Sequence, residues 1–106
     1  MVFVELTPFV AFRSEYWSDE DLRVLQSFLL VSPDAGVRIR GGAGLRKLRW
    51  SAQGHGKRGG ARVIYYWNVP EHRIYLIYGY VKSEREDLTP QQIKVLAELM
   101  KEVKDG

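Results

Sequence analysis

The sequence GGAGLRKLRWSAQGHGKRGGARVIYYW, from Gly41 to Trp67, predicts two strands joined by a basic loop that is rich in glycine. The second strand, Ala61–Val69, is the clearer one, because β-branched and aromatic residues fill it. The first, Leu45–Trp50, alternates with the period of a strand, yet neither of its faces is wholly apolar. We expect these two strands to pair and the rest of the chain to be arranged around them.

The flanking segments predict the remaining elements of an α+β fold. They are a strand over 2–6, helices over about 8–16 and 19–31, a loop over 34–44, a strand over 73–80 and a last helix from Thr89. Thr7, Ser18 and Thr89 are expected to cap the three helices, and the last has the spacing of a capping box. We predict one domain over residues 1–106. Its small antiparallel sheet carries an N-terminal helical hairpin and a C-terminal helix, all packed against one side.

The predicted strand over 73–80 is rich in tyrosine. Strict alternation puts Tyr75, Ile77 and Gly79 on one face and Ile74, Leu76, Tyr78 and Tyr80 on the other. A packed sheet also uses such tyrosines, so two or three of them are expected to be core. Tyr80 and Lys82 lie at the end of the strand, from which they can reach the basic middle of the chain.

Positive charge is concentrated in that middle segment. The window 36–70 holds eight of the sixteen Lys and Arg residues and no Asp or Glu, although the whole chain has a net charge of only +3. A merely soluble surface usually intersperses both signs. The simplest explanation is an anionic partner, and a phosphate backbone is the anion that we expect.

Composition excludes several classes of protein. With 106 residues, 45% of them hydrophobic, the chain can form a compact core, and it has no cysteine for disulfides, zinc ribbons or thiol catalysis. The N-terminus lacks the pattern of a signal peptide, and no apolar run approaches the ~20 residues of a membrane span. We therefore expect a cytoplasmic protein. No His, Asp or Glu cluster has metal-ligand spacing, and we expect neither a metal nor a cofactor.

The glycine-rich loop contains GHGKRG at residues 54–59, a literal G-x-G-x-x-G. A dinucleotide site requires a helix directly after this motif, whereas Ala61–Val69 is predicted to be a strand, so we reject that function. Glycine backbone beside Lys57 and Arg58 can still approach a phosphate, and His55 can touch RNA or transfer a proton. The alternative is a hairpin tip whose charges are only solvated.

Three cations on the predicted strands form the candidate site. Lys47 and Arg49 alternate on one face of the first strand, and Arg62 lies on the second, so pairing of the strands brings them to one patch. Scattered surface residues whose stems cover apolar area are the alternative, although no carboxylate is near them in sequence. The acidic run at residues 84–87 is expected to be a solvated loop rather than a catalytic carboxylate pair.

Several blocks of the sequence resemble the HigB branch of the RelE-like toxins. The specific block is GKRGGARVIYY at residues 56–66. Weaker blocks are GLRKLR at 44–49, IYLI at 74–77, YVKSE at 80–84 and DLT at 87–89. The similarity also includes the N-terminal strand and YWSDE at residues 16–20, so it covers nearly the whole chain. It implies the RelE-like, microbial-ribonuclease type of fold.

The resemblance also implies an activity, partners and site residues. The activity is ribosome-dependent cleavage of mRNA by attack of a 2′-hydroxyl on the adjacent phosphate, and the partner is a HigA-type antitoxin with a helix-turn-helix domain. Arg62 matches the phosphate-stabilising strand arginine, and Tyr80 matches a base-stacking aromatic residue. Lys57 or Lys82 is the expected proton-transfer group, since neighbouring cations favour the neutral form of a lysine. The predicted RNA-binding residues are Arg46, Lys47, Arg49, Arg58 and His55, beside the predicted catalytic residues Arg62, Lys57, Lys82 and Tyr80.

Two other functions stay open at this stage. A non-catalytic RNA- or DNA-binding module with the same basic face would show salt-dependent binding without cleavage. A protein with the toxin fold but no activity would only hold its antitoxin. The density of Lys, Arg and Tyr favours the endoribonuclease.

Overall fold

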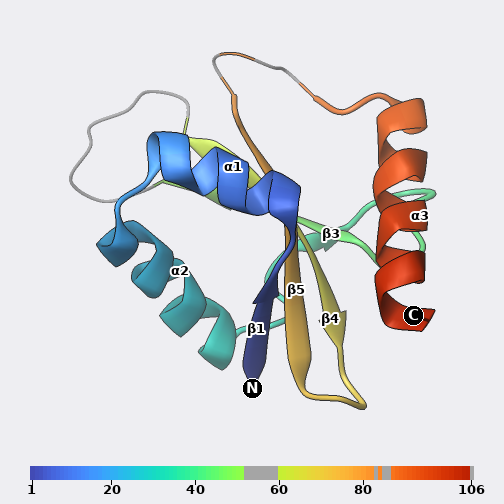
Figure 1. Cartoon of the computed structure of the whole chain (residues 1–106), viewed down its shortest axis with the longest axis horizontal. Helices are drawn as coiled ribbons and strands as arrows, with labels where there is room; N and C mark the ends of the chain where they lie inside the picture. The colour runs from blue at the N-terminus through green and yellow to red at the C-terminus, as the bar shows by residue number, and fades with distance from the viewer. Residues whose placement is uncertain (52–59, 83, 85–86, 106) are drawn as a thin grey trace.

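The computed structural model describes residues 1–51, 60–82, 84 and 87–105, and its five strands and three helices confirm the predicted α+β class. In chain order they are β1 Val2–Glu5, α1 Thr7–Tyr16, α2 Asp19–Val31, β2 Val37–Arg38, β3 Arg46–Trp50, β4 Ala61–Asn68, β5 Arg73–Val81 and α3 Pro90–Asp105. The predicted N-terminal helical hairpin and C-terminal helix are both present (Figure 1). The predicted loop over 34–44 contains the short strand β2, which the sequence did not indicate.

The strands form one sheet in the order β1-β5-β4-β3-β2. The pairs β2–β3, β3–β4 and β4–β5 are antiparallel, as predicted for strands with short links. The edge strand β1, in contrast, pairs with β5 in parallel, so the sheet is mixed rather than antiparallel throughout. Short links impose antiparallel pairing on consecutive strands, but β1 and β5 are far apart in the chain and no such constraint acts on them.

The helices cover both faces of the sheet, which corrects the prediction that they lie against one side. Helices α1 and α2 pack on one face, where Phe9, Phe12 and Leu25 join strand residues in a buried cluster. Helix α3 packs on the other face, where Met100 joins a second cluster with Ile64 and Ile77 (Figure 1). Strand β4 carries buried apolar residues on both of its faces, so each face needs its own cover.

Local signals explain where the helices begin. The side chains of Ser18 and Asp21 form a capping box at the start of α2, and those of Thr89 and Gln92 form another at α3. Helix α1 differs from the prediction, because Leu6 rather than Thr7 is its N-cap and no side chain caps it. No helix in the described part of the chain is long and apolar enough to cross a membrane.

A hydrogen-bonded tyrosine holds the segment that contains β2. The Tyr65 hydroxyl accepts from the Gly36 backbone N–H and donates to the Pro33 carbonyl, both at 2.8 Å. A side chain at Gly36 would collide with this ring, since a Cβ there would lie 2.8 Å from Tyr65 Cε1. A contact across 29 residues decides the shape of this segment, so its local sequence could not predict it.

A β-bulge in β5 changes which tyrosines face α3. Ile64 pairs with Tyr78 while Tyr65 pairs with Leu76, so Ile77 is the extra residue. The predicted alternation therefore fails beyond Ile77. Tyr78 and Tyr80 lie on the α3 face with Tyr75 and Ile77, whereas Gly79 faces α1 with Ile74 and Leu76.

Gly79→Ala should destabilise the fold, because a Cβ at this position would lie 2.4 Å from Phe12 Cδ2 inside a packed core. We expect a loss of about 1–3 kcal/mol in the free energy of unfolding, measured by chemical denaturation. In a Phe12→Leu background the smaller side chain leaves room for the methyl group, so the same substitution should cost less. An equal cost in both backgrounds would show that this contact is not what excludes a side chain.

Candidate active site

A row of three polar side chains crosses the sheet on the α3 face. Arg49 of β3 pairs with Arg62 of β4, and Arg62 pairs in turn with Tyr80 of β5. Directly paired residues of antiparallel strands share a face, so the three side chains lie side by side. Lys47 lies two residues along β3 and therefore shares this face with them. The structure thus brings together four of the residues that the sequence predicted.

The carboxylate of Asp87 lies among these groups. Its Oδ1 accepts a hydrogen bond of 3.1 Å from Lys47 Nζ and another of 3.1 Å from the Tyr80 hydroxyl. The backbone N–H of Leu88 donates to the same oxygen, also at 3.1 Å. One carboxylate, in the segment that leads into α3, therefore connects β3 and β5 across β4. Asp87 and Glu84 are both exposed and lie outside helices and strands, as expected for a solvated loop, but each also accepts a side-chain hydrogen bond, that of Glu84 coming from the Tyr16 hydroxyl.

Arg62 is a buried cation. The whole residue is only 8% exposed, and among the described residues its guanidinium makes one hydrogen bond, a long one of 3.4 Å to the Ala61 carbonyl. A guanidinium has five N–H donors in a planar fork, which matches the oxygens of a phosphate. Burying a charge is costly, so a largely buried arginine beside Arg49 and Tyr80 favours a functional role over a structural one.

Burial, hydrogen bonding and charge shift the pKa values of Tyr80 and Asp87, which are hydrogen-bonded to each other. Burial, the hydrogen bond to Asp87 and the charge of that carboxylate raise the pKa of Tyr80 to about 12, against an opposing effect of the Arg62 charge. The hydrogen bond from Lys47 holds the pKa of Asp87 below its usual value, assisted by Tyr80 and opposed by partial desolvation. At neutral pH Tyr80 is therefore a hydroxyl and Asp87 a carboxylate.

The Tyr80 ring itself is part of the core. The residue is 5% exposed and packs with Met100, so the ring has no open face on which an RNA base can stack. Its hydroxyl is the part that reaches the site, through the contact with Asp87. The base-stacking role that the family resemblance implies for Tyr80 therefore does not fit this packing.

The other predicted site residues lie elsewhere. Arg46 faces the opposite side of the sheet, where its guanidinium donates to the carbonyls of Gly36, at 2.7 Å, and Asp34, at 3.1 Å. Lys82 directly follows β5, and its backbone N–H donates to the Gly60 carbonyl at 3.2 Å, which ties it to the start of β4. The predicted residues His55, Lys57 and Arg58 lie outside the described residues.

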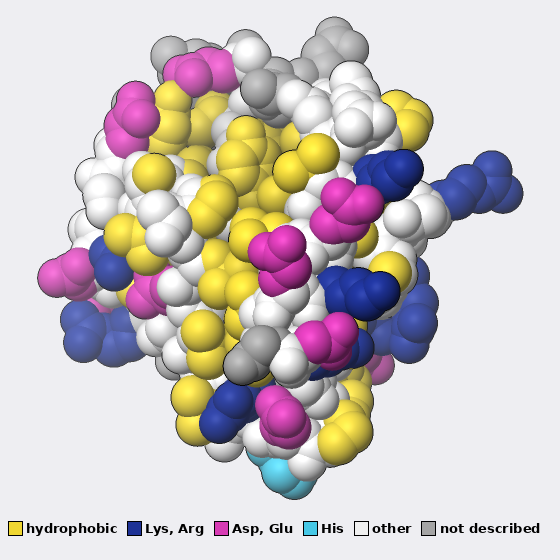
Figure 2. Space-filling view, turned by 45° about the vertical axis from the view of Figure 1, so that its right-hand side comes forward, with side chains coloured by type: hydrophobic (Ala, Val, Ile, Leu, Met, Phe, Trp, Pro, Cys, Tyr) yellow, Lys and Arg dark blue, Asp and Glu magenta, His cyan; other side chains and the backbone are white. Residues whose placement is uncertain are grey.

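Sequence reasoning missed Asp87 as a member of the site. It lies 40 residues from Lys47 in the chain, and it precedes a helix whose start gave no sign of which strands it would approach. The one available signal was that the basic window 36–70 lacks acidic residues, so any carboxylate that balances its charge has to come from outside it. Figure 2 shows the result on the α3 side of the molecule, where acidic and basic side chains intermingle around a strip of apolar ones.

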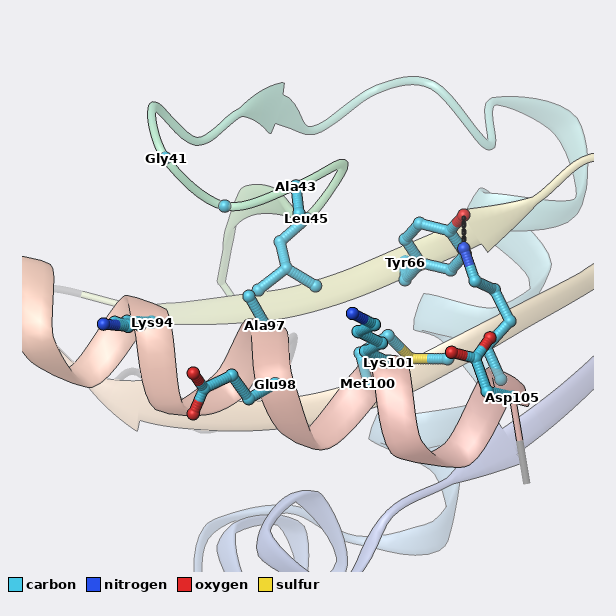
Figure 3. Close-up of a pocket in the computed structure, with 12 residues that line it drawn as sticks. Gly41, Ala43, Leu45, Tyr66, Lys94, Ala97, Glu98, Met100, Lys101 and Asp105 are labelled. Atoms are coloured by element: carbon cyan, nitrogen blue, oxygen red, sulfur yellow. Dashed lines mark hydrogen bonds between the residues drawn. The ribbon is translucent and has the colours of Figure 1, made fainter.

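A groove of about 470 Å³ lies on the same side, between α3 and the turn over residues 41–45. Figure 3 shows Leu45, Tyr66 and Met100 at this groove, with the Lys104 ammonium 3.3 Å from the Tyr66 hydroxyl. The Lys104 ammonium also lies 5.2 Å from the centre of the Tyr66 ring, in a cation–π contact. None of the predicted site residues lines this groove, so it is distinct from the polar row.

Comparisons with known proteins identify relatives of this chain. A family model described as the RelE toxin of the RelE / RelB toxin-antitoxin system matches residues 34–105, about two thirds of the chain. The solved structure of an arginine-to-alanine double mutant of the E. coli toxin RelE, in the free state, superposes with a TM-score of 0.61. The superposition covers 93% of this chain and 95% of that one at 16% sequence identity, so it shows a shared fold.

Ionisation of Tyr80 should weaken the fold at high pH. The pKa of Tyr80 is about 12 in the folded state, against 10.0 for an unperturbed tyrosine. Its contribution to stability is complete below pH 10 and is lost as the pH rises toward 12, because the unfolded chain ionises first. Tyr80→Phe should cost about 1 kcal/mol at neutral pH through the lost hydrogen bond but lose less stability across the alkaline range. Denaturant unfolding at a series of pH values measures this, and parallel curves for the two proteins would contradict the assignment.

Proposed function

Because the chain belongs to the RelE toxin family, a family of toxins from toxin–antitoxin systems, we propose that it is an endoribonuclease that cleaves mRNA on the ribosome and so inhibits translation. Membership of the family implies an antitoxin partner. We further propose that the chain belongs to the HigB branch, on the strength of the GKRGGARVIYY block at residues 56–66, and that its antitoxin is of the HigA type.

The observation that supports this proposal most strongly is the row of Arg49, Arg62 and Tyr80 across three strands, with Lys47 beside it. In the proposed reaction the RNA 2′-oxygen forms a bond to the adjacent phosphorus and the bond to the 5′-oxygen breaks, leaving a cyclic phosphate and a 5′-hydroxyl. Negative charge develops on the phosphoryl oxygens in the transition state. Fixed cations at that position stabilise it without having to reorganise.

Arg62 is the residue that we assign to the phosphoryl oxygens. The residue is only 8% exposed, and electrostatic interactions in buried surroundings are stronger than in water. Lys47 and Arg49 flank it on β3 and hold the backbone of the RNA, which is how cations position nucleic acid without reading its sequence.

Proton transfer needs two further groups, one to accept the 2′-hydroxyl proton and one to protonate the leaving 5′-oxygen. We assign the first to a lysine, Lys57 or Lys82. The Tyr80 hydroxyl keeps its proton at neutral pH, since its pKa is raised to about 12, and it donates that proton in a hydrogen bond to Asp87 rather than acting as a base. With this division the reaction does not need the paired histidines of a typical ribonuclease.

Arg62→Ala should abolish cleavage of translated mRNA and arrest of growth, with a loss of about 100-fold or more in rate, because the transition-state charge loses its main partner. The measurement is a translation reaction with one defined mRNA, in which primer extension maps the new 5′ ends. Arg23→Ala is the matched control, since Arg23 is an exposed arginine on α2 that pairs with Glu20, away from the α3 face.

The melting temperature of each variant shows whether loss of activity reflects loss of folding. A folded Arg62→Ala protein that cleaves mRNA as well as the wild type would contradict the catalytic role assigned to Arg62. Cuts on RNA without ribosomes would indicate a free ribonuclease. Binding without any cuts would favour the non-catalytic binding module.

Arg49→Ala should weaken RNA binding chiefly at low salt. The logarithm of the binding constant falls with the logarithm of salt concentration by ~0.7 for each phosphate contact on a single strand. The slope should therefore decrease by about 0.7 in this variant and stay unchanged in Arg23→Ala. Fluorescence anisotropy with a labelled single-stranded RNA over a range of salt measures it. An unaltered slope would show that Arg49 makes no phosphate contact.

A further inference from the structure

The carboxylate of Asp87 is an anion in the middle of a site that is proposed to bind an anion. Its Oδ1 takes three hydrogen bonds of 3.1 Å, from Lys47 Nζ, the Tyr80 hydroxyl and the Leu88 backbone N–H. A carboxylate that only repelled RNA would be a disadvantage here, so its place among these groups requires an explanation.

The position of Asp87 in the fold restricts its movement. It lies two residues before Thr89, whose capping box with Gln92 begins α3. Its bond to the Leu88 N–H ties the side chain to the same helix start. Helix α3 is packed on the sheet through Met100, so the carboxylate is attached to a rigid element rather than to a free loop.

The two side chains that Asp87 holds come from strands on either side of β4. Lys47 lies on β3 and Tyr80 on β5, and Arg62 lies on β4 between those strands. A lysine ammonium sits on a flexible stem with four carbons and takes many positions unless something fixes it. Asp87 Oδ1 lies between Lys47 and Tyr80 and fixes the Lys47 ammonium relative to the Tyr80 hydroxyl, on the face of the sheet that Arg62 shares.

We propose that Asp87 is a positioning residue of the active site: held by the Tyr80 hydroxyl, it fixes the Lys47 ammonium, which has further protons to donate, beside the phosphate that Arg62 binds. This inference rests on the proposed endoribonuclease function and adds a residue to it. Displacement of the carboxylate by incoming RNA would break three hydrogen bonds at one oxygen, and it is the alternative that the test has to exclude. The low pKa of Asp87 keeps it charged at neutral pH and thus keeps Lys47 in place.

The test is Asp87→Asn, which preserves the shape of the side chain but removes its charge. The rate of cleavage at saturating substrate should fall about 10-fold or more, as it does when a group that orients an active-site residue is removed. The substrate concentration at half-maximal rate should stay the same or fall, because a negative charge has left a surface that attracts RNA. Single-turnover cleavage of a defined mRNA on purified ribosomes measures both quantities. Asp87→Glu, which keeps the charge, should restore part of the rate.

Glu84→Gln is the matched control. It makes the same chemical change in the same segment, but Glu84 accepts its hydrogen bond from Tyr16 rather than from a residue of the site. We expect wild-type kinetics from it. In a Lys47→Ala background, Asp87→Asn should have much less effect than in the wild type, because a residue that acts through Lys47 has nothing left to position.

The outcomes separate this inference from the function on which it rests. Cleavage by the wild type with a slow Asp87→Asn protein of normal melting temperature supports both. Wild-type or faster cleavage by Asp87→Asn overturns the positioning role and leaves the carboxylate as a counter-ion that RNA displaces. Equal losses in the Asp87→Asn and Glu84→Gln proteins overturn it too. A wild-type protein that cuts no mRNA overturns the endoribonuclease proposal and the role of Asp87 together.

Discussion

Burial of strand β4 on both faces is the constraint on which the rest of the structure depends. The five residues from Ala61 to Tyr65 are all buried, with Val63 and Tyr65 facing α1 and α2 and Ile64 facing α3. Helices are therefore needed on both sides, and the N-terminal pair and the C-terminal helix divide that task. Arg62 is the exception in this run, because it brings a charge into a strand that is otherwise apolar. Burial of this charge is unfavourable for folding. An anion-binding role for Arg62 would explain why the charge is kept there.

Helix α3 does more than cover the second face. Its apolar side supplies Met100 to the core, while the segment before its capping box brings Asp87, two residues before Thr89, to Lys47. The same helix places Lys104 over the ring of Tyr66. The charge separation that is so clear in the sequence thus becomes a mixed surface in three dimensions (Figure 2). The basic window 36–70 contains no acidic residue, and the carboxylate that binds one of its lysines, Lys47, comes from Asp87 outside it.

Much of the fold follows from the sequence, because local rules govern the features concerned. The capping boxes at Ser18 and Thr89 and the period-two pattern of Ala61–Asn68 predicted two helices and the central strand with their boundaries nearly right. Apart from the N-cap of α1, which is Leu6 rather than Thr7, the failures are non-local. Parallel pairing of β1, the bond from Tyr65 to Gly36, and the extra residue at Ile77 are set by contacts between distant segments. The bulge matters most, since it alone moves Tyr80 to the face that Arg62 occupies.

The candidate site also combines features that follow from local sequence with one that depends on contacts between distant segments. Pairing of two neighbouring strands was enough to predict that Lys47, Arg49 and Arg62 converge, whereas Asp87 reaches them only through the packing of α3. Burial, together with the hydrogen bond to Asp87, raises the pKa of Tyr80 to about 12, so its hydroxyl does not act as a base near neutral pH. The proton of the attacking 2′-hydroxyl then has to go to an amine. Lys47 donates a hydrogen bond to the Asp87 carboxylate, so the proposed reaction assigns that proton to Lys57 or Lys82 instead.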